Sequence, residues 1–240
     1  MSVVKRLRTR FARRFFPDRE QFAAPIRDDA MRLMAWFDFL FVDFGILRFF
    51  WKNRAQVGAR AFRMNQPYPG DIARAAREGI RTIVTIRHDP RHGGHALVAE
   101  ACARHGLTYV TIPFFSREAP SRAAILDAAA FFARADYPLL MHCKSGADRA
   151  GFISALYLIV AENVPVREAR HQLSLRFLHF SASRTGILDA VFAAYLAAHA
   201  DEATPFLDWV QQDYDPARLM QTFKARGVAD FIDRILLRRE

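Results

Sequence analysis

Apolar and polar positions form two kinds of run that alternate along the middle of the chain. Short, mostly apolar runs are typical of buried strands, whereas apolar positions recurring every three or four residues are typical of helices. The strand-like runs lie within 57–70, 80–87, 107–114 and 137–143, and the helix-like runs within 71–79, 93–106, 120–135 and 151–160. This alternation predicts an α/β fold with a central, mostly parallel sheet of four to five strands flanked by helices.

The ends of the chain have a different pattern, which predicts helical additions. Helical periodicity continues through 166–176 and 184–199, and two shorter amphipathic segments follow within 205–240. Before the first strand-like run, a basic arm is followed by an aromatic-rich stretch. We therefore predict three parts: residues 1–54, a central domain over 55–200, and a helical C-terminal extension over 201–240.

The first twenty residues form the basic arm, which carries +5 of the net charge of +10. Its apolar residues Val4, Leu7, Phe11 and Phe15 are spaced by three or four, so the arm can form a helix with one apolar and one basic face. Such a helix suits an anionic membrane surface. Beyond the arm the basic residues are scattered and no aromatic nucleic-acid-binding motif occurs, so we expect no nucleic-acid partner.

The aromatic-rich stretch "AWFDFLFVDFGILRFFW" spans residues 35–51. Asp38, Asp43 and Arg48 interrupt it every five residues, which excludes a transmembrane span. The stretch either packs on the rest of the chain or lies at a membrane interface. Because carboxylates are repelled by anionic lipid, packing is the favoured alternative.

Composition limits the number of domains, the cellular setting and the kinds of site that we expect. A chain of 240 residues with 52% hydrophobic content can bury one full core. Its two cysteines, Cys102 and Cys143, suggest no disulfide framework, and no signal-peptide pattern is present, so we expect a reducing, cytoplasmic setting. Cys102 lies on a helical pattern and is predicted to be a core residue, with a protective disulfide to Cys143 as the minority alternative. His88, His92, His95 and His105 fit no tight ligand spacing, so no metal site is expected.

The candidate chemistry lies in "MHCKSGADRAGF", residues 141–152. A strand runs here into a buried helix through small residues, so the backbone can curl and point N–H groups inward as an anion cradle. The helix start and a guanidinium both favour the thiolate form of Cys143, which predicts a nucleophile. Arg149 can hold two oxygens of a phosphoryl group with its planar fork and stabilise charge in the transition state. Lys144, Ser145, Gly146 and Ala147 would line the cradle around the substrate.

The pattern His142-Cys143-x5-Arg149, in the form "HCKSGADRAG", resembles the signature loop of the cysteine-dependent protein tyrosine phosphatase superfamily. The dual-specificity and bacterial HCKxGxDR branch, which is similar to lipid and inositide phosphatases, fits best. The resemblance extends from "FRMNQP" at 62–67 to "GILDAVFAAY" at 186–195. It implies a phosphatase-like catalytic domain over 55–200, a phosphocysteine intermediate on Cys143, and no cofactor. His142 would orient the loop, and Arg63 and Arg117 would lie near the site.

Two departures from the family pattern bear on activity. The family usually has Ser or Thr after the arginine, where this chain has Ala150; Ser145 can substitute only in part, so a catalytically weak, phospholigand-binding pseudophosphatase is an alternative. The family's usual acid is an aspartate some thirty residues before the cysteine, but residues 111–121 contain none. By resemblance to lipid phosphatases, Asp148 is preferred as the general acid over Glu118, and its alternative role is to orient Arg149.

Substrate class follows from the same resemblance and from charge. Lys144 would meet a second phosphate, as in inositide phosphatases, and the basic arm favours a membrane surface. We therefore expect a phosphorylated lipid or inositide, with lipid A phosphate among the candidates, at the cytoplasmic face of the inner membrane, where the protein would be peripheral. A protein tyrosine or dual-specificity phosphatase is the second hypothesis. A rhodanese-type sulfurtransferase is a further one, disfavoured by the Asp148-Arg149 pair.

Overall fold

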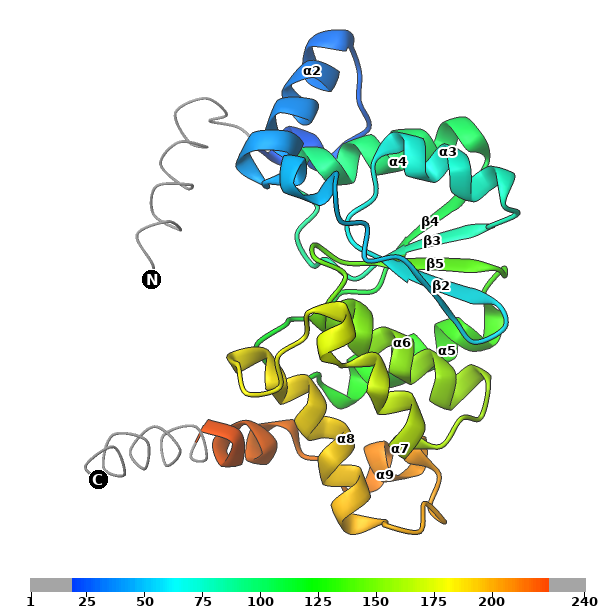
Figure 1. Ribbon diagram of the computed structural model, residues 1–240, viewed down its shortest axis with the longest axis vertical. Coiled ribbons are helices and arrows are strands. Elements are labelled where there is room, and N and C mark those ends of the chain that lie inside the picture. Colours follow the sequence, from blue (N-terminus) through cyan, green and yellow to red (C-terminus); the bar gives the residue numbers. More distant parts are fainter. Residues whose placement is uncertain (1–18, 225–240) are drawn as a thin grey trace, which may run out of the picture. The chain divides into compact units, whose positions relative to one another are not determined.

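The computed structural model describes residues 19–224, and its contacts divide the chain into two compact units (Figure 1). Unit 1 comprises Met1–Pro113 and Asp136–Gly146, and unit 2 comprises Phe114–Ala135 and Ala147–Glu240. The chain therefore passes from unit 1 to unit 2 within the loop predicted to hold the active site. Most of the basic arm and the end of the C-terminal extension lie outside the described residues.

Unit 1 contains a five-stranded sheet, which confirms the predicted α/β fold with a mostly parallel sheet. Its strands are β1 (Ala55–Val57), β2 (Ala61–Met64), β3 (Thr82–Thr85), β4 (Thr108–Thr111) and β5 (Leu139–His142), in the order β1-β2-β5-β3-β4. The β1–β2 pair is antiparallel and the other pairs are parallel. All four residues of the central strand β5 are buried, as the apolar run Leu139–Met141 predicts, and His142 is buried with them.

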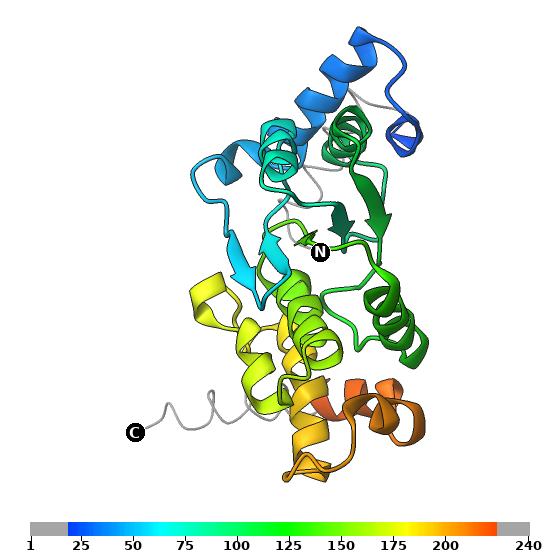
Figure 2. The same ribbon diagram turned by 90° about the vertical axis from the view of Figure 1, so that its right-hand side faces the viewer.

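Two helices cover one face of this sheet. Figures 1 and 2 show α3 (Pro69–Arg77) and α4 (Gly93–His105) on the same side of the strands. Their inner residues, including Ile72, Val98 and Cys102, form one core cluster with Ile83 and Leu140 of the sheet. Cys102 is thus the core residue that its helical pattern predicts.

The aromatic-rich stretch adds a helical layer to unit 1. It forms the end of α2 (Asp29–Phe37), a π-helical turn (Asp38–Val42) and a 3-10 helix, η3 (Gly45–Arg48); a shorter turn, η1 (Glu20–Ala23), precedes α2. Asp28 caps α2 by accepting a hydrogen bond from the Met31 amide at 2.7 Å. One face of α2 packs on α4 in a second core cluster with Phe39 and Val42. Packing is therefore confirmed for this face, although the stretch is not one continuous helix.

Unit 2 is helical. Its helices are α5 (Arg122–Arg134), α6 (Asp148–Ala161), α7 (Val166–Ala169), α8 (Ile187–Ala198) and α9 (Phe206–Gln212), with short 3-10 turns η4 (Arg170–Gln172), η5 (Leu175–Phe177) and η6 (Arg184–Gly186). Every residue of α6 from Ala150 to Leu158 is buried. Its Phe152 ring packs between the rings of Phe114 and Phe192, 5.3 and 5.2 Å away between centroids.

Two predictions about the helical regions have definite outcomes. The helical structure predicted over 166–176 is present only in part, because α7 ends after four residues, the 3-10 turn η4 continues it to Gln172, and a separate 3-10 turn begins at Leu175. Within 205–240, helix α9 and a helical segment over 216–224 match the two predicted amphipathic segments as far as the structure describes them. Among residues 19–224, no helix is long and apolar enough to cross a membrane. The predicted part boundaries at residues 54 and 200 stay predictions.

Candidate active site

The first half of the candidate site is the loop that follows β5 in unit 1. Gly146 has a φ of +73°, and a Cβ atom placed on it would lie 2.7 Å from the Asn65 amide nitrogen. Both the left-handed conformation and the close approach of the β2 backbone therefore require glycine here. The turn brings the Gly146 amide within 3.3 Å of the Cys143 Sγ atom, to which it donates a hydrogen bond.

The outer side of this loop is fixed by three donors that bind successive carbonyl groups. The Gln66 amide donates to the Lys144 carbonyl at 3.1 Å, the Asn53 side chain to the Ser145 carbonyl at 3.2 Å, and the buried Arg63 guanidinium to the Gly146 carbonyl at 2.6 Å. In a trans peptide the C=O group and the following N–H group point in opposite directions. The amides of Ser145 and Gly146 therefore point toward the inner side, which is the arrangement of an anion-binding nest.

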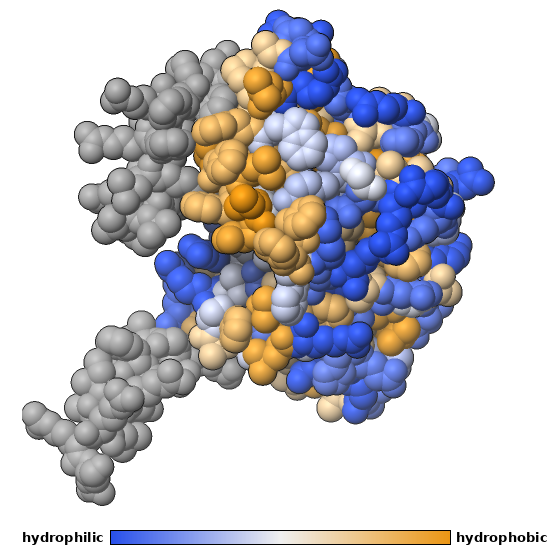
Figure 3. All heavy atoms as spheres, turned by 45° about the horizontal axis from the view of Figure 1, so that its top comes forward, coloured by the Kyte–Doolittle hydropathy of each residue, from blue (hydrophilic) through white to orange (hydrophobic). Residues whose placement is uncertain are grey.

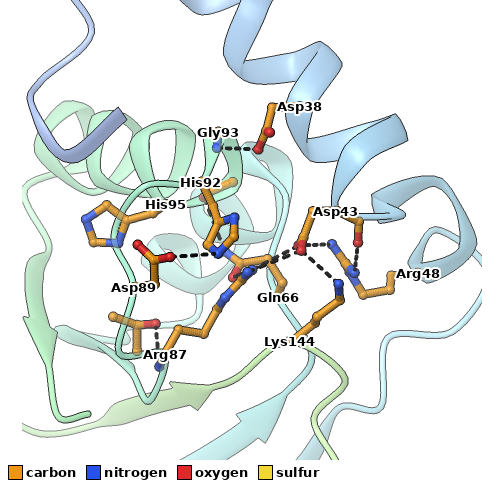
Figure 4. A network of polar contacts seen from close by, with 12 residues as sticks. Asp38, Asp43, Arg48, Gln66, Arg87, Asp89, His92, Gly93, His95 and Lys144 are labelled. Atoms are coloured by element: carbon orange, nitrogen blue, oxygen red, sulfur yellow. Dashed lines mark hydrogen bonds and ion pairs between the residues drawn. The ribbon is translucent and has the colours of Figure 1, made fainter. Parts of the chain in front are cut away.

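A buried carboxylate, Asp43, holds the side chain of Lys144 (Figure 4). Its oxygens lie 2.8 Å from Lys144 Nζ, 2.8 Å from Arg48 and 2.9 Å from Arg87. Burial alone would raise the pKa of Asp43, but attraction to the three cations outweighs it and holds this pKa far below its ordinary value. One negative charge thus meets three positive charges, which leaves two positive charges in excess beside the loop.

The second half of the candidate site lies at the start of α6 in unit 2. Asp148 and Arg149 occupy the first turn of this helix and are half-buried. The Asp148 carboxylate lies 2.7 Å from Nδ1 of the buried His179, whose Nε2 lies 2.5 Å from Asp189 on α8. His179 therefore joins two carboxylates from different helices.

The charges of this second half follow from burial and from the hydrogen bonds. Burial alone would lower the pKa of His179, but hydrogen bonds to Asp148 and Asp189 outweigh it and raise this pKa to about 9. Burial would raise the pKa of Asp148, but hydrogen bonds from His179 and Thr185 hold it below its ordinary value. At neutral pH, Asp148 is thus ionised and His179 carries the available proton.

The structure distributes the remaining candidate residues over different environments. Ala150 is fully buried in α6, whereas Glu118 and Arg117 are exposed in the segment between β4 and α5. His142 is buried at the end of β5, with its ring parallel to that of Tyr109. Both cysteines are free thiols, so the Cys102–Cys143 disulfide is absent. Within residues 19–224, no group of three or more His, Cys, Asp or Glu side chains is arranged to hold a metal ion.

Sequence reasoning missed four residues that support the candidate site. Asp43 was treated only as an interruption of an apolar stretch, and Asn53, Gln66 and His179 were not singled out. Gln66 lies in "FRMNQP", a segment that the resemblance places near the active site. A contact between this segment and the signature loop could therefore have been predicted. The contacts of Asp43 and His179 join residues 101 and 31 positions apart, which no local pattern reveals.

A comparison with protein families finds one relevant match. Residues 62–157 match the family model described as the phosphatase-like domain of the beta-lactamase hydrolase-like protein. The matched segment runs from β2 to α6 and includes the whole loop from Cys143 to Arg149. This agrees with the resemblance that the loop residues carry. A search of curated proteins gives no match.

Solved structures of low sequence identity resemble parts of the chain. TpbA from Pseudomonas aeruginosa has a TM-score of 0.48 and 21% identity, with 66% of this chain and 88% of TpbA covered. PTPMT1 has a TM-score of 0.46 and 18% identity, with 62% of this chain and 99% of that chain covered. Tk-PTP in its active form has a TM-score of 0.44 and 19% identity, with 52% and 85% covered.

Proposed function

We propose that this chain is a phosphatase of the cysteine-dependent protein tyrosine phosphatase superfamily, and that it hydrolyses phosphate monoesters through a phosphocysteine intermediate. The match of residues 62–157 to a phosphatase-like family model supports the proposal. One observation carries the proposal: the Gly146 amide donates to Cys143 Sγ in a loop whose carbonyl groups are bound on the outside. Inward amides stabilise a thiolate and, after attack, the oxygens of a bound phosphoryl group. A buried, inert cysteine needs neither feature.

The reaction has two steps. The Cys143 thiolate attacks phosphorus, so an S–P bond forms while the bond to the ester oxygen breaks, and Arg149 binds two of the phosphoryl oxygens. Asp148 gives a proton to the departing oxygen. Water then attacks the phosphocysteine, the S–P bond breaks, inorganic phosphate leaves, and the thiolate is restored. Asp148 accepts the proton that this water releases.

His179 would supply the proton that Asp148 needs. Asp148 is ionised at neutral pH, whereas the His179 imidazolium lies 2.7 Å from it and also faces Asp189. A proton can therefore pass from His179 to Asp148 as negative charge develops on the departing oxygen, and it returns after hydrolysis. His179 therefore acts on the substrate only through Asp148 and does not contact the reacting atoms itself. Glu118 is the alternative acid, and its replacement by Gln tests that alternative.

The substrate proposed is a phosphorylated lipid or inositide, with lipid A phosphate among the candidates, at the cytoplasmic face of the inner membrane. The support is electrostatic: the Asp43 cluster leaves two positive charges in excess around Lys144, and the first twenty residues carry +5. A substrate with a second phosphate close to the scissile one complements this excess charge. The partners would thus be the phosphorylated substrate and an anionic membrane surface.

The test is a metal-free activity panel of aryl phosphate, phosphopeptide, inositol phosphates and lipid phosphates. We expect turnover by the wild type, none by Cys143→Ser, and near-normal turnover by Cys102→Ser, which changes the other buried thiol. Turnover that survives Cys143→Ser would exclude the mechanism. Preference for the phosphopeptide would favour a protein tyrosine or dual-specificity phosphatase, and tight binding without turnover would favour a pseudophosphatase.

A further inference from the structure

Residues 41–51 expose an unusual number of large apolar side chains. Seven of them are between 40 and 88% exposed, and we call this set the aromatic patch: Phe41, Phe44, Ile46, Leu47, Phe49, Phe50 and Trp51. Phe50 and Leu47 are the most exposed, at 88 and 69%. Figure 3 shows apolar side chains gathered on the part of unit 1 formed by α2 and the turns after it. Contiguous exposed apolar surface of this kind marks an interaction site.

The charged side chains of the same segment point the other way. Asp38 and Asp43 are 0 and 2% exposed, and Arg48 is 9% exposed. Asp38 pairs with Arg19 and accepts a hydrogen bond from the Gly93 amide, and Asp43 pairs with its three cations. The segment is thus inverted relative to an ordinary surface segment, with its charges inside and its aromatic rings outside. The carboxylates that argued against contact with anionic lipid are buried and paired.

Polar contacts hold the patch in this inverted arrangement. The Arg48 guanidinium donates to the Asp43 carbonyl at 2.8 Å, and the Tyr68 hydroxyl donates to the Gly45 carbonyl at 2.8 Å. The Phe49 ring meets the Tyr68 ring edge-on, 6.2 Å away between centroids. The outward rings therefore belong to a braced turn, so little conformational entropy is lost when a partner binds them.

We propose that the aromatic patch docks this protein on a lipid bilayer by inserting Leu47, Phe50 and Trp51 at the boundary between head groups and acyl chains. Phe, Leu and Trp are the residues that enter this boundary in interfacial segments. The inference deepens the proposed function and rests on it for the identity of the substrate, because a lipid phosphate monoester is presented at this surface. A second copy of the chain is the less favoured partner for the aromatic patch, since each copy has a net charge of +10 and the two copies would repel each other.

Docking would also bear on the signature loop. Asp43 and Arg48 belong to the segment that carries the patch, and Asp43 holds Lys144 at 2.8 Å. Lys144 directly follows Cys143 in the chain. The same buried cluster therefore links the outward rings to the loop, so that insertion of the patch brings the loop of unit 1 to the membrane surface.

The test is vesicle binding by the full-length protein at about 1 M salt, where screening removes most electrostatic attraction. We expect the wild type to sediment with vesicles of phosphatidylcholine and phosphatidylglycerol, and the variant Leu47→Ser/Phe50→Ser to bind them at least about tenfold more weakly. Leu175→Ser/Phe180→Ser is the matched control, because these unit 2 residues are 67 and 56% exposed. Vesicles should shift the fluorescence of the wild type to the blue, and Trp51→Phe should lose most of this shift.

Several results would overturn docking. One is that the patch variant Leu47→Ser/Phe50→Ser binds vesicles as well as the wild type, and another is that the control variant loses as much binding as the patch variant. A third is that the wild type forms a dimer without lipid and that Leu47→Ser/Phe50→Ser dissociates this dimer. A fourth is greater quenching of Trp51 by iodide after Leu7→Ser/Phe11→Ser, which would make the basic arm the occupant. Turnover of a soluble aryl phosphate separates the two proposals: we expect it unchanged in the patch variant, whereas turnover in Cys143→Ser would exclude the proposed function whatever the vesicles show.

Discussion

Gly146 is the residue on which the loop geometry depends most directly. An alanine there would have to adopt a left-handed conformation and place its Cβ atom 2.7 Å from the Asn65 amide nitrogen. We expect Gly146→Ala to lower stability by about 1–3 kcal/mol and to weaken binding of vanadate at least about tenfold. Gly79→Ala is the control, since Gly79 has a similar φ of +82° and no atom within 4 Å of the added Cβ. Vanadate titration and urea unfolding measure the two effects, and equal losses of vanadate binding would contradict the role of the loop.

Ala150 bears on the second step of the proposed reaction, the breakdown of the phosphocysteine. The signature loop that this chain resembles usually has a hydroxyl after the arginine to help the thiolate leave, and this chain has a buried methyl group there. We expect Ala150→Ser to raise steady-state turnover several-fold while leaving the burst rate nearly unchanged, because only the second step gains a hydrogen bond. Quench-flow kinetics on an aryl phosphate separate the steps. Ala155→Ser, which adds a hydroxyl at another buried position of α6, should give no such gain.

His179 should give both activity and stability a defined pH dependence. Its pKa is about 9 in the folded protein and about 6.5 when unfolded, so its contribution to stability is complete below pH 6.5 and is lost as the pH rises through 9. The full contribution is up to about 3 kcal/mol. We expect His179→Gln to be less stable than the wild type at pH 6, with a difference that shrinks toward pH 10. Urea unfolding across this range measures it, and a constant difference would contradict the assignment.

The same residue predicts a kinetic effect that a merely structural role would not produce. If His179 supplies the proton that Asp148 transfers, turnover of an alkyl phosphate should fall as the pH rises through about 9, and His179→Gln should lack this limb. An activated aryl phosphate, whose departing oxygen needs little protonation, should show a much smaller difference between the two proteins. If the wild type showed the same pH profile for both substrates, His179 would not supply the proton and its role would be structural only.

At the scale of elements, the Asp43 cluster joins the aromatic-rich segment to the signature loop and to Arg87, which follows β3. Asp43→Asn would leave Arg48, Arg87 and Lys144 without their shared counter-charge in a buried site. We expect a loss of about 3–5 kcal/mol in the free energy of unfolding, as for other broken buried ion pairs. Glu78→Gln is the control: Glu78 also pairs with two arginines but at the surface, where the expected loss is below about 1 kcal/mol. Similar losses in urea unfolding would show that the cluster is not a buried ion-pair network.

The elements that sequence predicted best are those whose burial follows a local period. The apolar run "LLM" of β5 is buried together with His142, and Gly106, the last residue of the helix-like run 93–106, ends α4 in a left-handed conformation. The loop from Cys143 to Arg149 was recognisable for a similar reason. Its cysteine, glycine and charged residues lie within seven consecutive positions, so the local sequence is enough to show the resemblance to the signature loop.

The elements that sequence predicted poorly depend on contacts between distant residues. The helical pattern over 166–176 is interrupted after Gln172, and the chain then turns at Ser174, whose carbonyl accepts hydrogen bonds from the amides of Phe177 and His179. This turn carries His179 to Asp148 and Asp189, and two charge-assisted hydrogen bonds outweigh the helical propensity of the sequence. The inward position of the Asp43 carboxylate could not be predicted from the sequence for the same reason, since its three cations lie at positions 48, 87 and 144.

At the scale of the whole molecule, the uneven net charge should divide membrane binding into two separable contributions. If the docking proposal holds, we expect the arm to supply electrostatic attraction that salt screens, and the aromatic patch to supply apolar contact that salt does not weaken. Each arginine near an anionic surface contributes about 1 kcal/mol. We expect Arg6→Gln/Arg8→Gln/Arg10→Gln to weaken binding to phosphatidylglycerol vesicles up to roughly a hundredfold at about 0.1 M salt.

The control for this variant changes the same net charge elsewhere. Arg77→Gln/Arg104→Gln/Arg134→Gln removes three exposed arginines of the described chain and should have a much smaller effect, because these arginines belong neither to the arm nor to the aromatic patch, the two segments proposed to meet the membrane. At about 1 M salt, where only apolar contact remains, the arm variant should bind as the wild type does. The patch variant Leu47→Ser/Phe50→Ser should bind weakly at both salt concentrations. Co-sedimentation of the three variants at the two concentrations thus assigns attraction and insertion to different segments, and equal losses from the arm and control variants would mean that net charge alone governs the attraction.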